Sequence, residues 1–216
     1  MTKAKLTLAS SVLLVLGCAA ALSASRHLIL NTELANAYEN VDASLSQERT
    51  PLSFSGGAGA SDCNGYLTLR TRYGVEETVS NQLIRGEYLV CDALNILARA
   101  EPARAVGPEP GKTLLSRLDL RSFPSSLRPA ATDAAYTLAT MFPTQISSSR
   151  NIAQLDTGDW MLSLELVAAA RINDNAIPDW IVWMADEAKS GNYRSYQTLV
   201  IYDPERPGML TAIMSR

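Results

Sequence analysis

Hydrophobic and polar residues alternate most regularly in the second half of this 216-residue chain. Between 160 and 167, leucine occupies every second position at Leu162, Leu164 and Leu166, which is the two-residue period of a β-strand. Three further strands are predicted at 180–185, 193–202 and 209–214. Short polar segments at 186–192 and 203–208 join these strands, so we expect an antiparallel meander of four strands.

The first half of the chain shows helical spacing instead. Apolar residues recur every three or four positions over 26–45 and again over 77–100, which predicts an amphipathic helix and a long helix weakened by Gly86. Short helices are expected at 114–120 and 130–142, and one strand at 66–73, where Leu67 and Leu69 alternate with polar residues. Helices in the N-terminal half and a sheet in the C-terminal half predict an α+β fold.

Proline and glycine divide the chain into three regions. Residues 1–25 form an export signal or anchor, and residues 26–61 contain the amphipathic helix followed by a connector at 53–61 with three glycines. We expect this connector to lie outside the core. Residues 62–216 then form a single globular domain, in which 101–111, with three prolines and two glycines, is a loop.

The N-terminal segment has the order of a bacterial export signal. Lys3 and Lys5 precede an uncharged stretch from 6 to 25. Its quartet Val15-Leu16-Gly17-Cys18 resembles the lipobox of bacterial lipoproteins, and this resemblance implies that Cys18 carries a lipid. Two alternatives remain: a plain cleavable signal ending in Ala19-Ala20-Ala21, or an uncleaved helix of about 30 Å. Each alternative delivers the rest of the chain outside the cytoplasm.

The cysteine count agrees with export. If Cys18 is lipidated or removed, Cys63 and Cys91 remain, and an oxidising compartment favours a disulfide between them. The alternative is that Cys91, among Leu89, Val90 and Leu94, is simply a small buried residue.

Charge and residue types argue against several functions. The net charge is −3, and no cluster joins basic residues with aromatic ones, so nucleic acid is not an expected partner. The segment 107–113 has only three residues between its glycines, two of them proline, and therefore does not form a nucleotide-binding phosphate loop. His27 is the only histidine, which argues against a catalytic triad or a histidine-based zinc site.

One loop suggests a metal site. The segment 171–180 resembles the calcium loops of FG-GAP repeats, and the resemblance implies Asn173, Asn175 and Asp179 as oxygen ligands. Arg171 and Ala176 depart from that pattern at the first ligand and at the glycine. The alternative is a hairpin loop whose Asn and Asp side chains bond their own backbone. We therefore expect no cofactor, with calcium as the alternative.

Aromatic residues concentrate between 160 and 202, and we expect most of them to be buried. The segment with Asn192, Tyr193, Arg194 and Tyr196 is the candidate recognition edge, because aromatic and arginine side chains dominate binding surfaces.

The sequence favours an exported, lipoprotein-like binding or structural protein of the bacterial envelope. We expect it to be held at a membrane by its N-terminal lipid or helix and to bind an envelope protein or another envelope component, without catalysis. The alternatives are a calcium-dependent binding module and a secreted hydrolase using carboxylates, for which the candidates are Asp156, Asp159, Glu165, Asp179, Asp186 and Glu187.

Overall fold

A computed structural model describes residues 27–173 and 175–215. The export signal, including Cys18, lies outside the described residues. In the described part of the chain, no helix combines the length and apolar character that crossing a bilayer requires.

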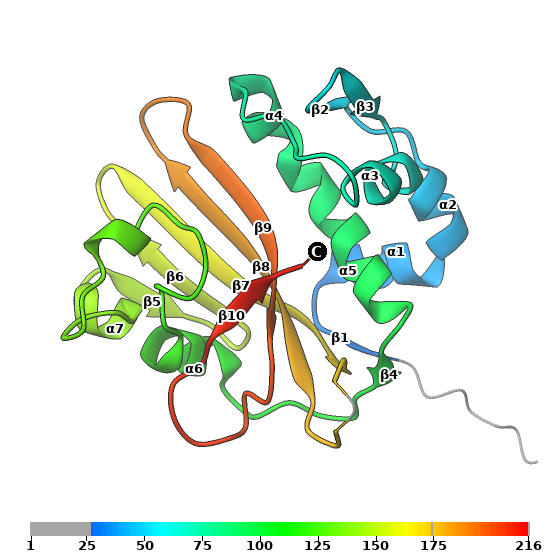
Figure 1. The fold of residues 1–216 in the computed structure, drawn as a ribbon. Helices are drawn as coiled ribbons and strands as arrows, with labels where there is room; N and C mark the ends of the chain where they lie inside the picture. The colour runs from blue at the N-terminus through cyan, green and yellow to red at the C-terminus, as the bar shows by residue number, and fades with distance from the viewer. Residues whose placement is uncertain (1–26, 174, 216) are drawn as a thin grey trace, which may run out of the picture.

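An eight-stranded antiparallel sheet forms the centre of the molecule (Figure 1). Six strands follow the spatial order β10-β9-β8-β7-β6-β5, and β1 and β4 pair with the far end of β7. The strands of this sheet are β1 (Leu28–Ile29), β4 (Glu101–Pro102), β5 (Ile146–Ser148), β6 (Ile152–Asp156), β7 (Trp160–Arg171), β8 (Asp179–Ala188), β9 (Arg194–Ile201) and β10 (Ala212–Met214).

The mixed α+β prediction is confirmed, and the four predicted strands of the meander are β7 to β10. The sheet is nevertheless larger than predicted. Strands β5 and β6 extend it beyond β7, where Ala153 and Leu155 are buried. Strands of three and five residues carry too few alternating positions to stand out in the sequence.

Strand β7 lies inside the sheet between β8 and β6, and both of its faces are covered. A register shift between Leu166 and Ala168 puts Val167 and Ala168 on the same face. Leu162, Leu164 and Leu166 belong to the core on the opposite face. The bulge thus changes which residues of β7 face each core without interrupting the strand.

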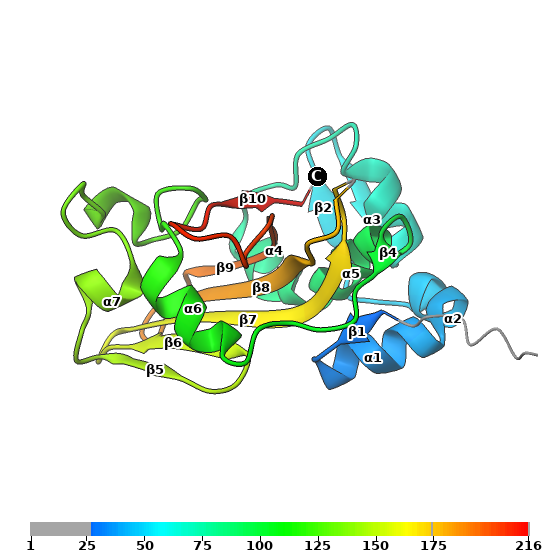
Figure 2. The same ribbon diagram turned by 90° about the horizontal axis from the view of Figure 1, so that it is seen from below.

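A helical layer built from the N-terminal half covers one face of the sheet (Figure 2). It contains α1 (Thr32–Glu39), α2 (Val41–Ser46), α3 (Cys63–Leu69), α4 (Val79–Ile84), the 3-10 helix η1 (Arg85–Tyr88) and α5 (Leu89–Leu97). The single helix predicted over 77–100 is therefore three consecutive pieces, and the 3-10 turn includes Gly86. The helix predicted over 26–45 begins only at Thr32, where the Asn31 side chain caps the backbone N–H of Leu34 at 2.9 Å.

Two predictions for the first half are wrong. Residues 66–73 do not form a strand, because the Asp62 carboxylate accepts from the N–H of Gly65 at 2.7 Å and starts α3. The segment 53–61 is not outside the core. It contributes to the hairpin of β2 (Leu52–Phe54) and β3 (Ala58–Ala60), in which Leu52 and Phe54 are fully buried.

The segment between β4 and β5 covers the other face of the sheet with α6 (Pro110–Arg117), the 3-10 turn η2 (Arg128–Ala130) and α7 (Leu138–Met141). The helix predicted over 130–142 is reduced to the single turn α7, which the Thr137 side chain starts by accepting from the N–H of Thr140. Gly111 lets α6 approach the β5–β6 turn so closely that an added Cβ would collide with the carbonyl oxygens of Ser149 and Ile152.

The predicted disulfide between Cys63 and Cys91 is present and joins α3 to α5, with both cysteines fully buried. In the chain-entropy model, closing a 28-residue separation stabilises a fold by about 3 kcal/mol. The bond therefore fixes the helical layer at the place where α3 and α5 contact each other.

Candidate functional site

A cleft of about 660 Å³ lies between the helical layer and the open side of β9. Its walls come from the end of α3 and the loop that follows, from η1, from the start of α5, and from β9 and the chain after β10. Three arginines line it: Arg70, Arg72 and Arg85. We call it the arginine cleft, and we treat it as the candidate functional site because its size suits a small ligand.

Arg70 forms the floor of the arginine cleft. Its side chain, 10% exposed, is ion-paired with Asp92, which is 9% exposed. The Tyr66 hydroxyl lies 3.3 Å from the same carboxylate, and the Arg70 guanidinium lies 5.6 Å from the centre of the Tyr66 ring. A buried charge is tolerated when it is paired in this way, and the pair holds α3 against α5.

The other two arginines are less firmly engaged. Among the described residues, Arg85 pairs only with the exposed Glu77, at 3.4 Å. The Arg72 side chain makes no hydrogen bond or ion pair with any described residue. Burial lowers the pKa of Arg70, and the charges of Arg99 and Arg85 lower it further against the opposing effect of Tyr66. Three arginines and one carboxylate, that of Asp92, line the cleft, so its lining carries an excess of positive charge although the net charge of the chain is −3.

Tyr196 forms the opposite wall of the arginine cleft. Its ring packs near Gly86, and its hydroxyl donates to Glu187 at 2.6 Å. Burial and then this hydrogen bond to a carboxylate raise the pKa of Tyr196 to about 12. The neutral phenol is thus the form present at ordinary pH, and it presents a fixed aromatic surface to the cleft.

The structure separates the four residues of the predicted recognition edge. Asn192 is exposed in the turn before β9, and Arg194 holds that turn through the carbonyl of Ala188 and an ion pair with Glu187 at 3.6 Å. The Tyr193 ring lies 5.2 Å from that of Trp160, across the sheet from the arginine cleft, and its pKa is raised by burial and then by Asp186. Tyr196 is the one member that lines the cleft.

The residues of the calcium-like loop lie together, and the side-chain oxygens of Asp179 and Asn175 accept hydrogen bonds within the protein, whereas the buried Oδ1 of Asn173 has no hydrogen-bond partner among the described residues. Asp179 is fully buried and accepts three backbone N–H groups, from Ile172, Asn173 and Asp203, at 2.9 to 3.1 Å. Asn175 accepts from the N–H of Ile177 at 2.7 Å and donates to Asp203 at 2.7 Å. Within the described residues, no group of three or more His, Cys, Asp or Glu side chains is placed to hold a metal ion.

Most carboxylates considered for hydrolysis have a role in the fold. Asp186 is fully buried and accepts from both Ser126 groups, at 2.7 and 2.8 Å, and from the Trp160 indole N–H at 2.6 Å. Asp156 pairs with Lys189, and Glu165 accepts from Asn31 at 3.0 Å. Asp159 is exposed. These contacts fasten strands and loops together.

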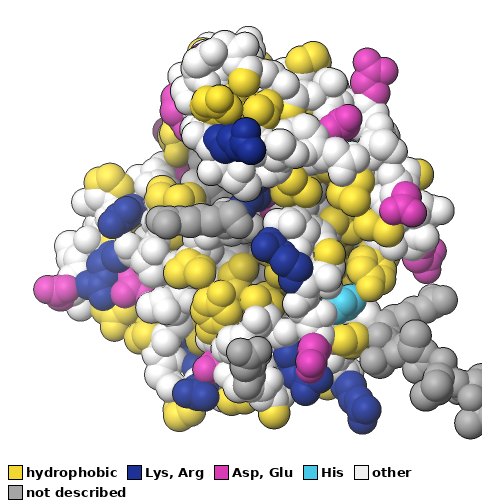
Figure 3. Space-filling view, turned by 45° about the vertical axis from the view of Figure 1, so that its right-hand side comes forward, with side chains coloured by type: hydrophobic (Ala, Val, Ile, Leu, Met, Phe, Trp, Pro, Cys, Tyr) yellow, Lys and Arg dark blue, Asp and Glu magenta, His cyan; other side chains and the backbone are white. Residues whose placement is uncertain are grey.

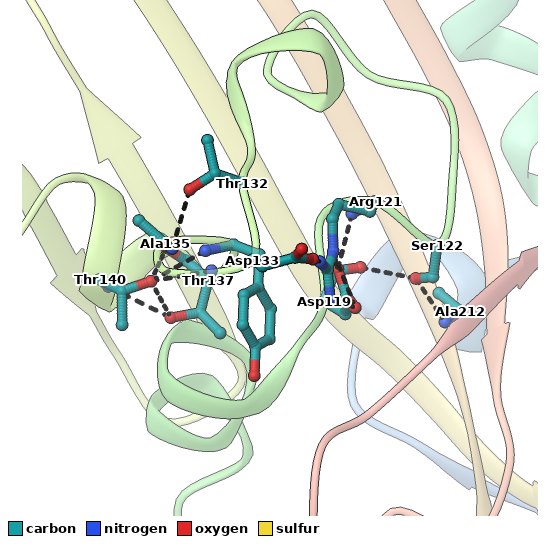
Figure 4. A network of polar contacts seen from close by, with 10 residues as sticks. Asp119, Arg121, Ser122, Thr132, Asp133, Ala135, Thr137, Thr140 and Ala212 are labelled. Atoms are coloured by element: carbon teal, nitrogen blue, oxygen red, sulfur yellow. Dashed lines mark hydrogen bonds and ion pairs between the residues drawn. The ribbon is translucent and has the colours of Figure 1, made fainter.

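A second polar network lies on the other side of the sheet (Figure 4). Arg121 contacts Asp119 at 2.8 Å and Asp133 at 2.6 Å, and its guanidinium lies 4.1 Å from the centre of the Tyr136 ring. The hydrogen bonds from Arg121 hold the pKa of Asp119 below its usual value. Two carboxylates match the Arg121 charge, and the network holds the segment between α6 and α7 over the core.

Sequence reasoning missed the arginine cleft. The strand predicted over 66–73 made Arg70 and Arg72 two of its polar, solvent-facing positions, with no indication that they line a cleft. Asp62 was the available signal for a helix start, because aspartate is among the strongest N-cap residues. No sequence pattern indicated that β9 would lie close to α3 and η1.

In comparisons with protein-family models, curated proteins and solved structures, nothing matches this chain. The arginine cleft and its chemistry are therefore the basis for the functional argument.

Proposed function

We propose that this chain is an exported, membrane-anchored binding protein of the bacterial cell envelope that holds an envelope component in the arginine cleft without catalysing a reaction. The observation that carries the proposal is the preformed cleft, whose floor is fixed by the Arg70–Asp92 pair and by the disulfide between α3 and α5. A cleft with rigid walls binds with less ordering cost than a mobile one.

Two further features support the envelope location. The lipobox-like quartet at Val15 to Cys18 supplies an attachment point, and disulfides persist in oxidising compartments such as the periplasm. Asp179 and Asp186, two of the carboxylates that a hydrolase would use, are saturated with hydrogen bonds inside the fold. Binding therefore accounts for the cleft more directly than hydrolysis does.

The anchor is tested by expressing the full chain in a bacterium supplied with an alkyne-labelled fatty acid. We expect the label on the wild-type protein, which fractionates with membranes and is digested by protease added outside the cytoplasmic membrane. Cys18→Ser, the matched control, loses the label. A mature chain beginning after Ala21, unlabelled and released from membranes, contradicts the anchored part of the proposal.

Binding is tested separately by affinity capture from solubilised envelopes with the anchored protein. We expect Arg72→Gln/Arg85→Gln to lose what the wild type captures, whereas Arg128→Gln, an exposed arginine that lines no part of the cleft, retains it. Equal capture by all three proteins contradicts the role of the arginine cleft.

A further inference from the structure

A second cleft of about 700 Å³ adjoins the arginine cleft. Most of its lining is apolar, with Ile96 from α5, Val200 from β9 and Ile213 from β10, and we call it the apolar cleft. Arg99 and Ser122 contribute polar groups to the same lining. Met214 and Ser215 line both clefts and form the wall between them. The Ser215 hydroxyl lies 3.2 Å from Arg70, so this wall is tied directly to the floor of the arginine cleft.

Three exposed hydrophobic side chains line the apolar cleft. Ile213 is 50% exposed, Tyr202 42% and Met214 40%, and all three line this one cleft. Grouped apolar side chains on a surface indicate a place where a ligand or partner binds. Figure 3 shows a face on which basic side chains lie beside hydrophobic ones near the centre, with most acidic side chains toward the edge.

We propose that the two clefts together bind one anionic amphiphile with a single alkyl chain. Arg72 and Arg85 hold its phosphate or carboxylate group above the Arg70–Asp92 pair, and the alkyl chain lies in the apolar cleft beside Met214. This inference rests on the proposed binding function and names the chemical class of the ligand. Guanidinium groups match phosphate and carboxylate oxygens in geometry and charge, and a flexible methionine adapts to an alkyl chain.

The groups that line the two clefts suit an amphiphile, because guanidinium groups gather in one cleft and exposed apolar side chains in the other. The chain at the start of β10 and just before it is bonded to the segment 117–122, which restricts the addition of a peptide strand there. Leu210 donates to the carbonyl of Arg117 at 2.7 Å and accepts from Asp119 at 2.9 Å, and Ala212 donates to the Ser122 hydroxyl at 3.0 Å. Side-chain contacts in the two clefts supply the affinity for an amphiphile, and binding of an acidic peptide in its place is one outcome of the test below.

The experiment uses the full chain in phosphatidylcholine nanodiscs, titrated by calorimetry with octyl phosphate and with octanoate at monomeric concentrations. Inorganic phosphate and the neutral octyl glucoside are the matched probes. We expect saturable binding of both anionic amphiphiles. Arg72→Gln/Arg85→Gln weakens it about tenfold or more and Ile213→Ser about fivefold, whereas Arg128→Gln leaves it unchanged.

Several results would overturn the inference. Equal affinity for inorganic phosphate removes the role of the apolar cleft, and equal affinity for octyl glucoside removes the role of the arginines. If the protein binds only anionic vesicles, or only an acidic peptide, its ligand is a membrane surface or a peptide and not a single-chain amphiphile. If the chain is lipid-labelled and captures a partner through the arginine cleft but does not bind octyl phosphate, this inference is wrong and the proposed function still holds.

Discussion

At the scale of single residues, Gly111 is the described glycine at which an added side chain has the least space. Its Cα faces the carbonyl oxygens of Ser149 and Ile152, and its N–H donates to Arg150 at 3.2 Å. We expect Gly111→Ala to lower the free energy of unfolding by about 1 to 3 kcal/mol, because two backbone segments must separate to admit one methyl group. Urea denaturation followed by circular dichroism measures the change.

The control for this prediction is Gly107→Ala. A Cβ at Gly107 meets nothing within 4 Å, so we expect its effect to stay within about 0.5 kcal/mol. If the two variants unfold at the same urea concentration, α6 does not pack against the β5–β6 turn as described.

At the scale of elements, the disulfide decides how firmly the helical layer is held. We expect Cys63→Ala/Cys91→Ala to lower the free energy of unfolding by about 3 kcal/mol, because the unfolded chain regains the freedom that the bond removes. Guanidinium denaturation of the variant, and of the wild type with and without reductant, measures the effect. If the denaturation midpoint of the wild type is the same with and without reductant, Cys63 and Cys91 are not joined.

The elements also show what a sequence pattern can predict. Strands β7 to β9 were predictable because each has at least eight residues and a regular alternation or a dense apolar run. Helix α3 was not, because Leu67 and Leu69 alternate over only a few residues. Its helical form depends on the Asp62 cap and on packing of Tyr66 between Phe54 and Tyr88, with ring centroids 6.2 and 5.0 Å away. Long-range packing overrides a short local pattern.

At the scale of the whole molecule, the candidate site depends on contacts between distant parts of the chain. Arg70 meets Asp92 across 22 positions and Ser215 across 145. The disulfide was predictable because only two cysteines remain beyond the leader and their chemistry allows one pairing. An arginine has many potential partners, so only the arrangement of α3, α5 and β9 brings these residues together. Tyr196 was therefore a candidate from the sequence, whereas the cleft that it lines had no sequence signal.

The tyrosines around the core give the molecule a characteristic response to alkali. Burial raises the pKa of four tyrosines, Tyr66, Tyr88, Tyr193 and Tyr196, and that of Tyr196 reaches about 12. The pKa of tyrosine in an unfolded chain is about 10. Above pH 10 the folded chain thus holds more protons than the unfolded one, so the free energy of unfolding falls as pH rises through this window. Below pH 10 this contribution is fully present.

Tyr196→Phe tests this response, because the variant has no phenol to ionise beside Glu187. We expect its free energy of unfolding to fall less steeply between pH 10 and 12 than that of the wild type, in urea denaturation series at fixed pH. Tyr202→Phe, at a side chain that is 42% exposed, is measured alongside as a control for the loss of one phenol. Identical slopes for all three proteins would mean that Tyr196 is not held neutral against Glu187, and the arginine cleft would then lack its fixed aromatic wall.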